Sequence, residues 1–315
     1  MYQNFLYNGT TNSRWHSVYI FTDKGLDDAI KVILLPFTDF FYHENRIVSQ
    51  FFFIRYWEKG AHLRLRFKIS NLSSEQEELT KILAFIHEKL EQLLGSQINN
   101  QETIKEHNFI KIEQYEPEYN RYGGEYGILL AEQLFQLSSL TVLEMIRSTG
   151  GREAAAKIAS AIQLHWVFNK VLLATHPEPI LGIYHQAFKG WLPNYMIADF
   201  KDLDEQSATI TQKFSSNFIQ QKKQILDMIS LIDQELTTCQ DRDEWLKVWS
   251  EGLTILSAAF NDFKRKKFGD ILHVSRESKA YLNHIVGSYI HMTNNRLGVN
   301  NIDESFIGYI MERLI

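Results

Sequence analysis

Cysteine and proline are scarce in this chain of 315 residues, which contains one Cys and five Pro. The single thiol, Cys239, excludes an internal disulfide and a metal site built from several cysteines. No apolar run reaches bilayer-spanning length, and the N-terminus lacks the basic and apolar segments of a signal peptide. We therefore expect a cytoplasmic protein that does not interact with a membrane.

The signatures of several common chemistries are also missing. The sequence contains no phosphate-binding loop, dinucleotide fingerprint, HExxH motif, paired CxxC motif or nucleophile elbow. Its histidines and acidic residues are scattered rather than spaced as metal ligands, so we expect no metal and no cofactor. The net charge of −5 argues against a general nucleic-acid-binding protein, and any cationic site must be local.

Apolar residues, in contrast, make up 44% of the chain, and their spacing predicts two kinds of structure. Strands are predicted at 15–22, 47–57, 61–69 and 109–115, a helix that breaks or kinks at Pro36 between the first two, and a further helix at 72–94. Helices are predicted at 125–147, 152–171, 180–190, 203–237, 243–264 and 277–296. The fold class is therefore α+β, with a small, mostly antiparallel sheet in the N-terminal third packed with a large helical layer from the C-terminal two thirds.

No long polar linker marks a domain boundary in this pattern. We expect a single domain, 1–315, with a sheet-rich part at 12–117 and a mainly helical part at 118–315.

The strand at 61–69 alternates apolar residues with His62, Arg64, Arg66 and Lys68. One face of this strand is thus apolar and the other cationic. Two interpretations stay open: an anion lies over the cationic face, or acidic residues of a neighbouring element balance it. The preceding strand is joined to this one by a short loop, so the pair is predicted to form a hairpin that brings Arg55 near the cationic face if the register allows.

A second cationic position lies in the loop before the helix at 125. Glu118 and Arg121 are three residues apart and are expected to pair, and Gly123 and Gly124 follow them. Paired glycines allow a tight turn and leave backbone N–H groups at the positive end of the next helix dipole. This loop is a natural place for an anion.

The helix predicted at 277–296 carries a third polar cluster. His291 is followed within about one turn by Asn294, Asn295 and Arg296, on or beside the apolar stripe of the helix. A single histidine there is commonly a satisfied core residue, but this whole set is costly to bury without a polar purpose. Together these arginines and histidines are the residue types that bind carboxylates and move protons.

Five short motifs, in this order, resemble the C-terminal domain of class I lantibiotic dehydratases, also called the thiopeptide-type bacteriocin biosynthesis domain. They are Trp15–His16, FIRY at 53–56 with HLRLRF at 62–67, YEPE at 115–118, RYGG at 121–124, and HM at 291–292 with NRLG at 295–298. Each motif alone is weak, but the ordered set runs from near residue 12 to the C-terminus. The resemblance is therefore fairly specific.

The resemblance implies β-elimination of glutamate. In the family, Ser or Thr of a ribosomally made precursor peptide is glutamylated from glutamyl-tRNA by a larger domain, and this domain then expels glutamate to leave dehydroalanine or dehydrobutyrine. Matched by motif, the catalytic residues are His291, Arg66 and Arg121. The substrate-binding residues are Arg64, Glu118, Arg55, His62, Asn295 and Arg296.

The resemblance also implies partners. The chain looks like the freestanding elimination half of a split dehydratase, acting on a glutamylated precursor peptide made by a separate glutamyl-tRNA-dependent glutamylation protein, without a direct tRNA requirement and as a homodimer. Two alternatives stay open. One is a pyridine synthase that joins two dehydroalanines of a thiopeptide precursor in a formal [4+2] cycloaddition, and the other is a non-catalytic, peptide-presenting subunit.

Overall fold

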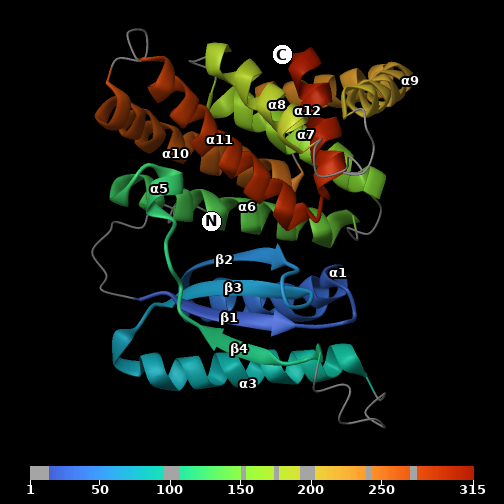
Figure 1. Ribbon diagram of the computed structural model, residues 1–315. Helices are drawn as coiled ribbons and strands as arrows, with labels where there is room; N and C mark the ends of the chain where they lie inside the picture. The colour runs from blue at the N-terminus through green and yellow to red at the C-terminus, as the bar shows by residue number, and fades with distance from the viewer. Residues whose placement is uncertain are drawn as a thin grey trace. The chain divides into compact units, whose positions relative to one another are not determined.

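The computed structural model describes residues 14–95, 107–149, 154–173, 177–191, 203–238, 243–269 and 275–315 (Figure 1). The chain divides into two compact units. We call the described residues of 14–117 and 138–149 the sheet unit, and those of 118–137 and 154–315 the helical unit. Cys239 lies outside the described residues. Whether the two units together form the single domain predicted from the sequence stays a prediction.

The sheet unit contains four antiparallel strands in the order β2-β3-β1-β4. Their bounds are β1 (His16–Phe21), β2 (Val48–Tyr56), β3 (His62–Ile69) and β4 (Ile110–Glu113). The predicted hairpin is formed by β2 and β3, and its turn uses positive φ angles at Lys59 and Gly60. Strand alternation places Leu65 and Phe67 on one face, fully buried, and Arg64 and Arg66 on the other.

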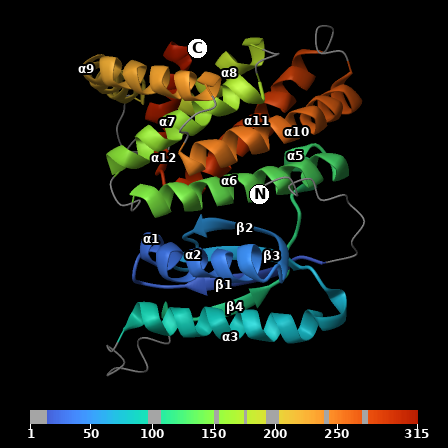
Figure 2. The same cartoon turned by 180° about the vertical axis from the view of Figure 1, so that it is seen from behind.

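Helical segments cover the apolar face of this sheet, as Figure 2 shows for α1 and α2. They are α1 (Leu26–Ala29), the π-helical η1 (Ile30–Leu34), α2 (Leu35–Phe37), the π-helical η2 (Thr38–Glu44), the 3-10 turn η3 (Leu72–Ser74) and α3 (Glu75–Leu94). The rings of Phe37 and Phe67 lie 5.9 Å apart across this layer. The covered face is therefore the apolar one, and the cationic side chains lie on the opposite face.

At Pro36 the backbone stays helical, and helical segments continue to Glu44, so the chain does not leave the helix there. Regular α-helical hydrogen bonding is nevertheless interrupted, because π-helical turns lie before and after α2. Proline lacks the N–H group that a regular α-helix needs, which agrees with this irregular backbone. The predicted kink stays a prediction.

The helical unit confirms the predicted run of helices. Its elements are α5 (Tyr119–Tyr122), α6 (Glu125–Thr149), α7 (Ala154–Val171), α8 (Pro177–Trp191), α9 (Leu203–Thr238), α10 (Glu244–Phe268), α11 (Arg276–Leu297) and α12 (Asn301–Leu314). The predicted α+β class is thus correct. The sheet and α1 to α3 come from roughly the first third of the chain, and the helices from α5 onward from the rest.

Helix α6 contributes to both units, since its first half belongs to the helical unit and its second half to the sheet unit. In the sheet unit, Ser139 of α6 accepts a hydrogen bond from the backbone N–H of Phe53 at 3.2 Å, next to strand β2. Within the described ranges α6 alone is long and apolar enough to cross a membrane, but 83% of its apolar window is buried. Packing in the protein core accounts for its apolar composition.

Candidate active site

Arg121 lies in α5, a single helical turn that ends in two glycines with positive φ, Gly123 at 92° and Gly124 at 97°. A Cβ at Gly123 would lie 2.7 Å from the ring of Phe263, so this turn needs glycine for both backbone angle and space. The turn joins α5 to α6 and fixes the backbone position of Arg121. The pair expected from the sequence is present: Arg121 Nη1 lies 3.0 Å from Glu118 Oε2.

A second contact orients the same guanidinium group. Arg121 Nε donates a hydrogen bond to Ser288 Oγ at 3.1 Å, and Ser288 is a buried residue of α11. Glu118 and Ser288 thus hold the group through two different nitrogens. Fixing a guanidinium in this way reduces the entropy that is lost when it binds a carboxylate.

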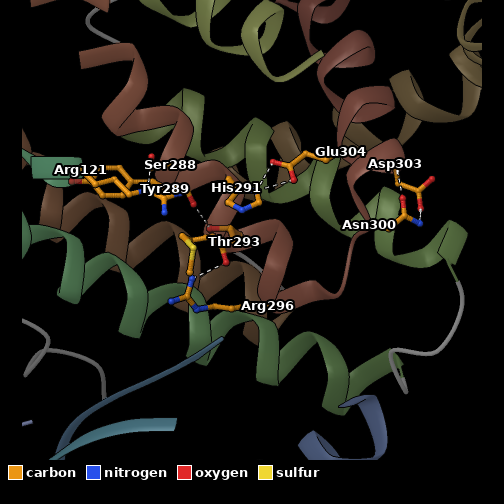
Figure 3. Close-up of polar contacts among 10 residues, drawn as sticks. Arg121, Ser288, Tyr289, His291, Thr293, Arg296, Asn300, Asp303 and Glu304 are labelled. Carbon is orange, nitrogen blue, oxygen red and sulfur yellow. Dashed lines mark hydrogen bonds and ion pairs between the residues drawn. The ribbon is translucent and has the colours of Figure 1, made fainter. Parts of the chain in front are cut away.

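His291 lies one turn further along α11 and faces the first turn of α12 (Figure 3). Its Nδ1 lies 2.9 Å and 3.1 Å from the two carboxylate oxygens of Glu304. The side chain of Glu304 is only 4% exposed and that of His291 27% exposed. Glu304 lies in the first turn of α12, at the positive end of the helix dipole, and its carboxylate orients the imidazole of His291 through Nδ1.

Arg121 and His291 line the same pocket, which has a volume of about 270 Å³. Ser288 and Glu304 lie in its wall, together with residues of α8 and α11. Those further residues are Ile183, Gln186, Ala187, Gly190, Asn283, His284 and Gly287. The pocket belongs entirely to the helical unit.

The sequence interpretation predicted the helix at 180–190 but not that it lines the pocket, and it missed Ser288 and Glu304. The contact of Arg121 with Ser288 joins residues 167 positions apart, and no local spacing signals it. His291 was identifiable only as part of a polar cluster, and its carboxylate partner lies 13 residues later on another helix.

Arg296 and Asn295 are absent from the pocket lining. Arg296 is fully buried, its Nη1 donates to the backbone carbonyl of Met292 at 2.7 Å, and its guanidinium lies 5.0 Å from the ring centre of Phe135. Figure 3 shows Arg296 pointing away from the pair formed by His291 and Glu304. These contacts hold Arg296 within the packed helices, and its substrate-binding role stays a prediction.

In the sheet unit, Arg64 is enclosed by aromatic rings. Its guanidinium carbon lies 3.4 Å from the ring centre of Tyr56 and 4.5 Å from that of Tyr19, on the two strands that flank β3. Its Nε donates a hydrogen bond to His62 Nε2 at 3.0 Å. Among the residues that the structure describes, no acidic side chain forms an ion pair with Arg64, so the interpretation that neighbouring acids balance it receives no support.

His62 holds Arg64 in place. Its Nδ1 bonds to the backbone carbonyl of Gly60 at 2.8 Å, so Nδ1 carries the hydrogen and Nε2 is the acceptor. Burial lowers the pKa of His62 below its ordinary value, which agrees with a neutral ring. His62 is only 1% exposed, so we expect it to position Arg64 rather than to contact a substrate directly.

Arg66 and Lys68 continue the row, two and four residues further along β3. The Arg66 guanidinium lies 5.4 Å from the ring centre of Phe52 and 5.0 Å from that of Tyr115. Lys68 Nζ lies 4.5 Å from the ring of Trp15. The cationic face predicted from the alternation is thus present, and each cation is placed by aromatic rings.

The expectation that Arg55 lies near this face is wrong. In the register of the hairpin, Arg55 pairs with Leu63, which places it on the helix-covered face. There it forms an ion pair with Asp27 of α1 at 2.6 Å, and it is 3% exposed. Arg55 joins the sheet to its helix layer.

The predicted residues therefore form two groups, one in each unit. Arg121, Glu118 and His291 lie in or beside the pocket of the helical unit, and Arg64, Arg66 and His62 lie on the cationic face of the sheet unit. In the part of the chain that the structure describes, no three His, Cys, Asp or Glu side chains are grouped as a metal site. A larger pocket of about 840 Å³, between α7, α9 and α10, contains the Lys170–Asp233 ion pair but none of the predicted residues.

Known proteins resemble this chain along nearly all of its length. The family model described as Lantibiotic biosynthesis dehydratase C-term matches residues 15–315. The epidermin biosynthesis protein EpiB of Staphylococcus epidermidis is 25% identical over 301 residues, which cover 93% of this chain and 25% of EpiB. The chain thus spans about a quarter of the length of that relative.

Two solved structures share the fold. The tRNA-dependent lantibiotic dehydratase MibB from Microbispora sp. 107891 is 17% identical with a TM-score of 0.59, and the match covers 98% of this chain and 28% of MibB. The pyridine synthase TbtD from thiomuracin biosynthesis is 15% identical with a TM-score of 0.61, and the match covers 95% of this chain and 97% of TbtD. At these identities the likeness concerns the fold alone.

Proposed function

The chain belongs to the family of lantibiotic biosynthesis dehydratase C-terminal domains, and from that premise we propose that it eliminates glutamate from glutamylated Ser and Thr of a ribosomally made precursor peptide. The products are dehydroalanine and dehydrobutyrine. Modification of ribosomal peptides is the role common to the family, and the elimination step is the specific proposal.

One observation carries this proposal: an oriented arginine and a carboxylate-bound histidine line one pocket. Arg121 is held by Glu118 and Ser288, and His291 by Glu304. The pocket has a volume of about 270 Å³. Such a pair suits a reaction in which a carboxylate leaves and a proton moves.

The chemistry assigns a role to each group. When the Cβ–O bond breaks, negative charge develops on the departing glutamate carboxylate, and Arg121 stabilises that charge. His291, oriented by Glu304, donates a proton to the same leaving group. Removal of one oriented donor of this kind commonly costs about 10²–10³-fold in kcat.

The cationic face of the sheet unit supplies the remaining recognition in this proposal. Arg64 and Arg66 bind the carboxylate of the glutamyl group that does not leave, because a guanidinium fork pairs with both oxygens of a carboxylate. Rings that cover the faces of these side chains keep the forks oriented. That Arg66 acts on the same substrate as Arg121 and His291 is part of the proposal.

The substrate requires an earlier reaction, and the proposal therefore includes a partner. A glutamyl-tRNA-dependent glutamylation protein forms the ester on the precursor peptide, and this chain receives the glutamylated peptide in the cytoplasm. Homodimer formation is a further part of the proposal.

Mass spectrometry of a glutamylated precursor peptide incubated with purified protein tests the function. We expect loss of glutamate with the wild-type protein, and accumulation of intact glutamylated peptide with Arg66→Ala, Arg121→Ala and His291→Ala. Lys170→Met is the matched control, because Lys170 lies in the other pocket of the helical unit, and it should eliminate at the wild-type rate. Normal elimination by all three arginine and histidine variants would contradict the proposal.

The alternatives give different results in the same assay. A pyridine synthase leaves glutamylated peptide unchanged and consumes a peptide that already carries dehydroalanines, whereas a peptide-presenting subunit changes neither. The fold likeness to TbtD keeps the first alternative in the test. The oriented fork of Arg121 favours elimination, because cycloaddition between dehydroalanines has no glutamyl carboxylate to bind.

A further inference from the structure

Two histidines line the pocket of the helical unit. His284 and His291 are seven residues apart on α11, which is nearly two full turns, so both project from the same side of the helix. Seven residues correspond to a rise of about 10.5 Å. Ser288, which accepts the hydrogen bond from Arg121, lies between them. Along this face of α11, the contact between Ser288 and Arg121 therefore lies between the two imidazole rings.

The two imidazoles differ in their surroundings. His291 faces the buried carboxylate of Glu304, which lies 2.9 Å from its Nδ1. His284 is exposed at the surface of the pocket and forms no hydrogen bond or ion pair with any residue in the described ranges. The ring of His291 is thus oriented by a carboxylate, whereas the ring nitrogens of His284 are available to a substrate.

We propose that His284 is the base that removes the Cα proton of the glutamylated residue. This inference rests on the proposed function and identifies the group that takes the Cα proton. The Cα–H electrons form the Cα=Cβ bond, the Cβ–O electrons leave with glutamate, and the Cα proton passes to His284. Arg121 and His291 stabilise the leaving carboxylate, and His284 then releases its proton to water because its ring is solvent-exposed.

The spacing agrees with this division of roles. In a glutamylated serine, the Cα–H bond and the ester oxygen lie on adjacent carbon atoms, a few ångströms apart. Ser288, and with it the contact to Arg121, lies four residues from His284, a rise of about 6 Å. In this proposal the ester is bound at Arg121 and the Cα proton is directed toward His284, and both groups line the same pocket.

The experiment uses the full-length protein and a glutamylated peptide with protium or deuterium at Cα. We expect His284→Asn to slow elimination by about 10²–10⁴-fold, the usual contribution of a general base, with KM unchanged and the isotope effect of the Cα–H bond fully expressed. Added imidazole should restore part of the rate of His284→Ala, which a purely structural role would not allow. His185→Asn is the matched control, because His185 is an exposed histidine of α8 that pairs with Glu312 and lies outside the pocket.

Three outcomes would count against His284. Wild-type elimination rates in His284→Asn, together with loss of activity in His291→Ala, would overturn this inference and leave the proposed function intact. A slow His284→Ala variant without imidazole rescue, and with raised KM, would assign His284 to binding. Absence of glutamate loss with the wild-type protein would overturn the proposed function and this inference together.

Discussion

The two units hold their arginines by different means. In the helical unit, Arg121 is oriented through hydrogen bonds and an ion pair, to Ser288 and Glu118. In the sheet unit, Arg64 is oriented between the rings of Tyr56 and Tyr19, with a neutral histidine at its Nε. A carboxylate neighbour uses some of the positive charge of an arginine, whereas aromatic rings leave it available. We therefore expect Arg64 to attract an anion more strongly than Arg121, because Glu118 offsets part of the positive charge of Arg121.

The largest effect is expected at the pocket. Arg121→Lys retains the charge but loses the planar fork and the Nε contact to Ser288, so kcat should fall by about 10²-fold. Single-turnover elimination kinetics measure this effect. A lysine variant with the wild-type kcat would show that only the charge matters, and the contrast between the two units would lose its basis.

A stability effect of comparable free energy is expected on the other face of the sheet. Asp27→Asn leaves the buried Arg55 without its carboxylate, and we expect the free energy of unfolding to fall by about 3 kcal/mol. Burial lowers the pKa of Arg55, and Asp27 offsets this effect. Urea unfolding of the variant provides the measurement. Asp23→Asn, at an exposed position just before α1, is the control and should change stability little; equal effects would place the cost outside the ion pair.

The smallest effect concerns the aromatic enclosure. Tyr56→Leu keeps an apolar side chain beside Arg64 but removes the nearer ring, and a cation–π contact is worth about 1 kcal/mol, so KM for glutamylated peptide should rise about fivefold. Initial rates at several peptide concentrations separate KM from kcat. Tyr56→Phe keeps the ring and should bind as the wild type does. An equal loss in both variants would point to the tyrosine hydroxyl, which donates to Glu58 at 3.3 Å, instead of the ring.

The strands and helices could be predicted because their signals are local. Alternation along β3 gave the cationic face, and the helical periods gave α6 to α11 within a few residues of their ends. One feature failed because it depends on neighbours: the register of the hairpin moved Arg55 to the opposite face. Around Pro36 the sequence signalled an irregularity, but not that the backbone would stay helical through π-helical turns.

The sequence by itself determined the elements, the family and the residue types of the site. Arg121 and His291 were recognisable as candidates because the family motifs occur in order along the chain. Only the tertiary structure decided that Ser288 and Glu304 orient them and that α8 completes the pocket. The physical reason is that these contacts join side chains from different helices, and their geometry depends on how the helices pack, which no local pattern encodes.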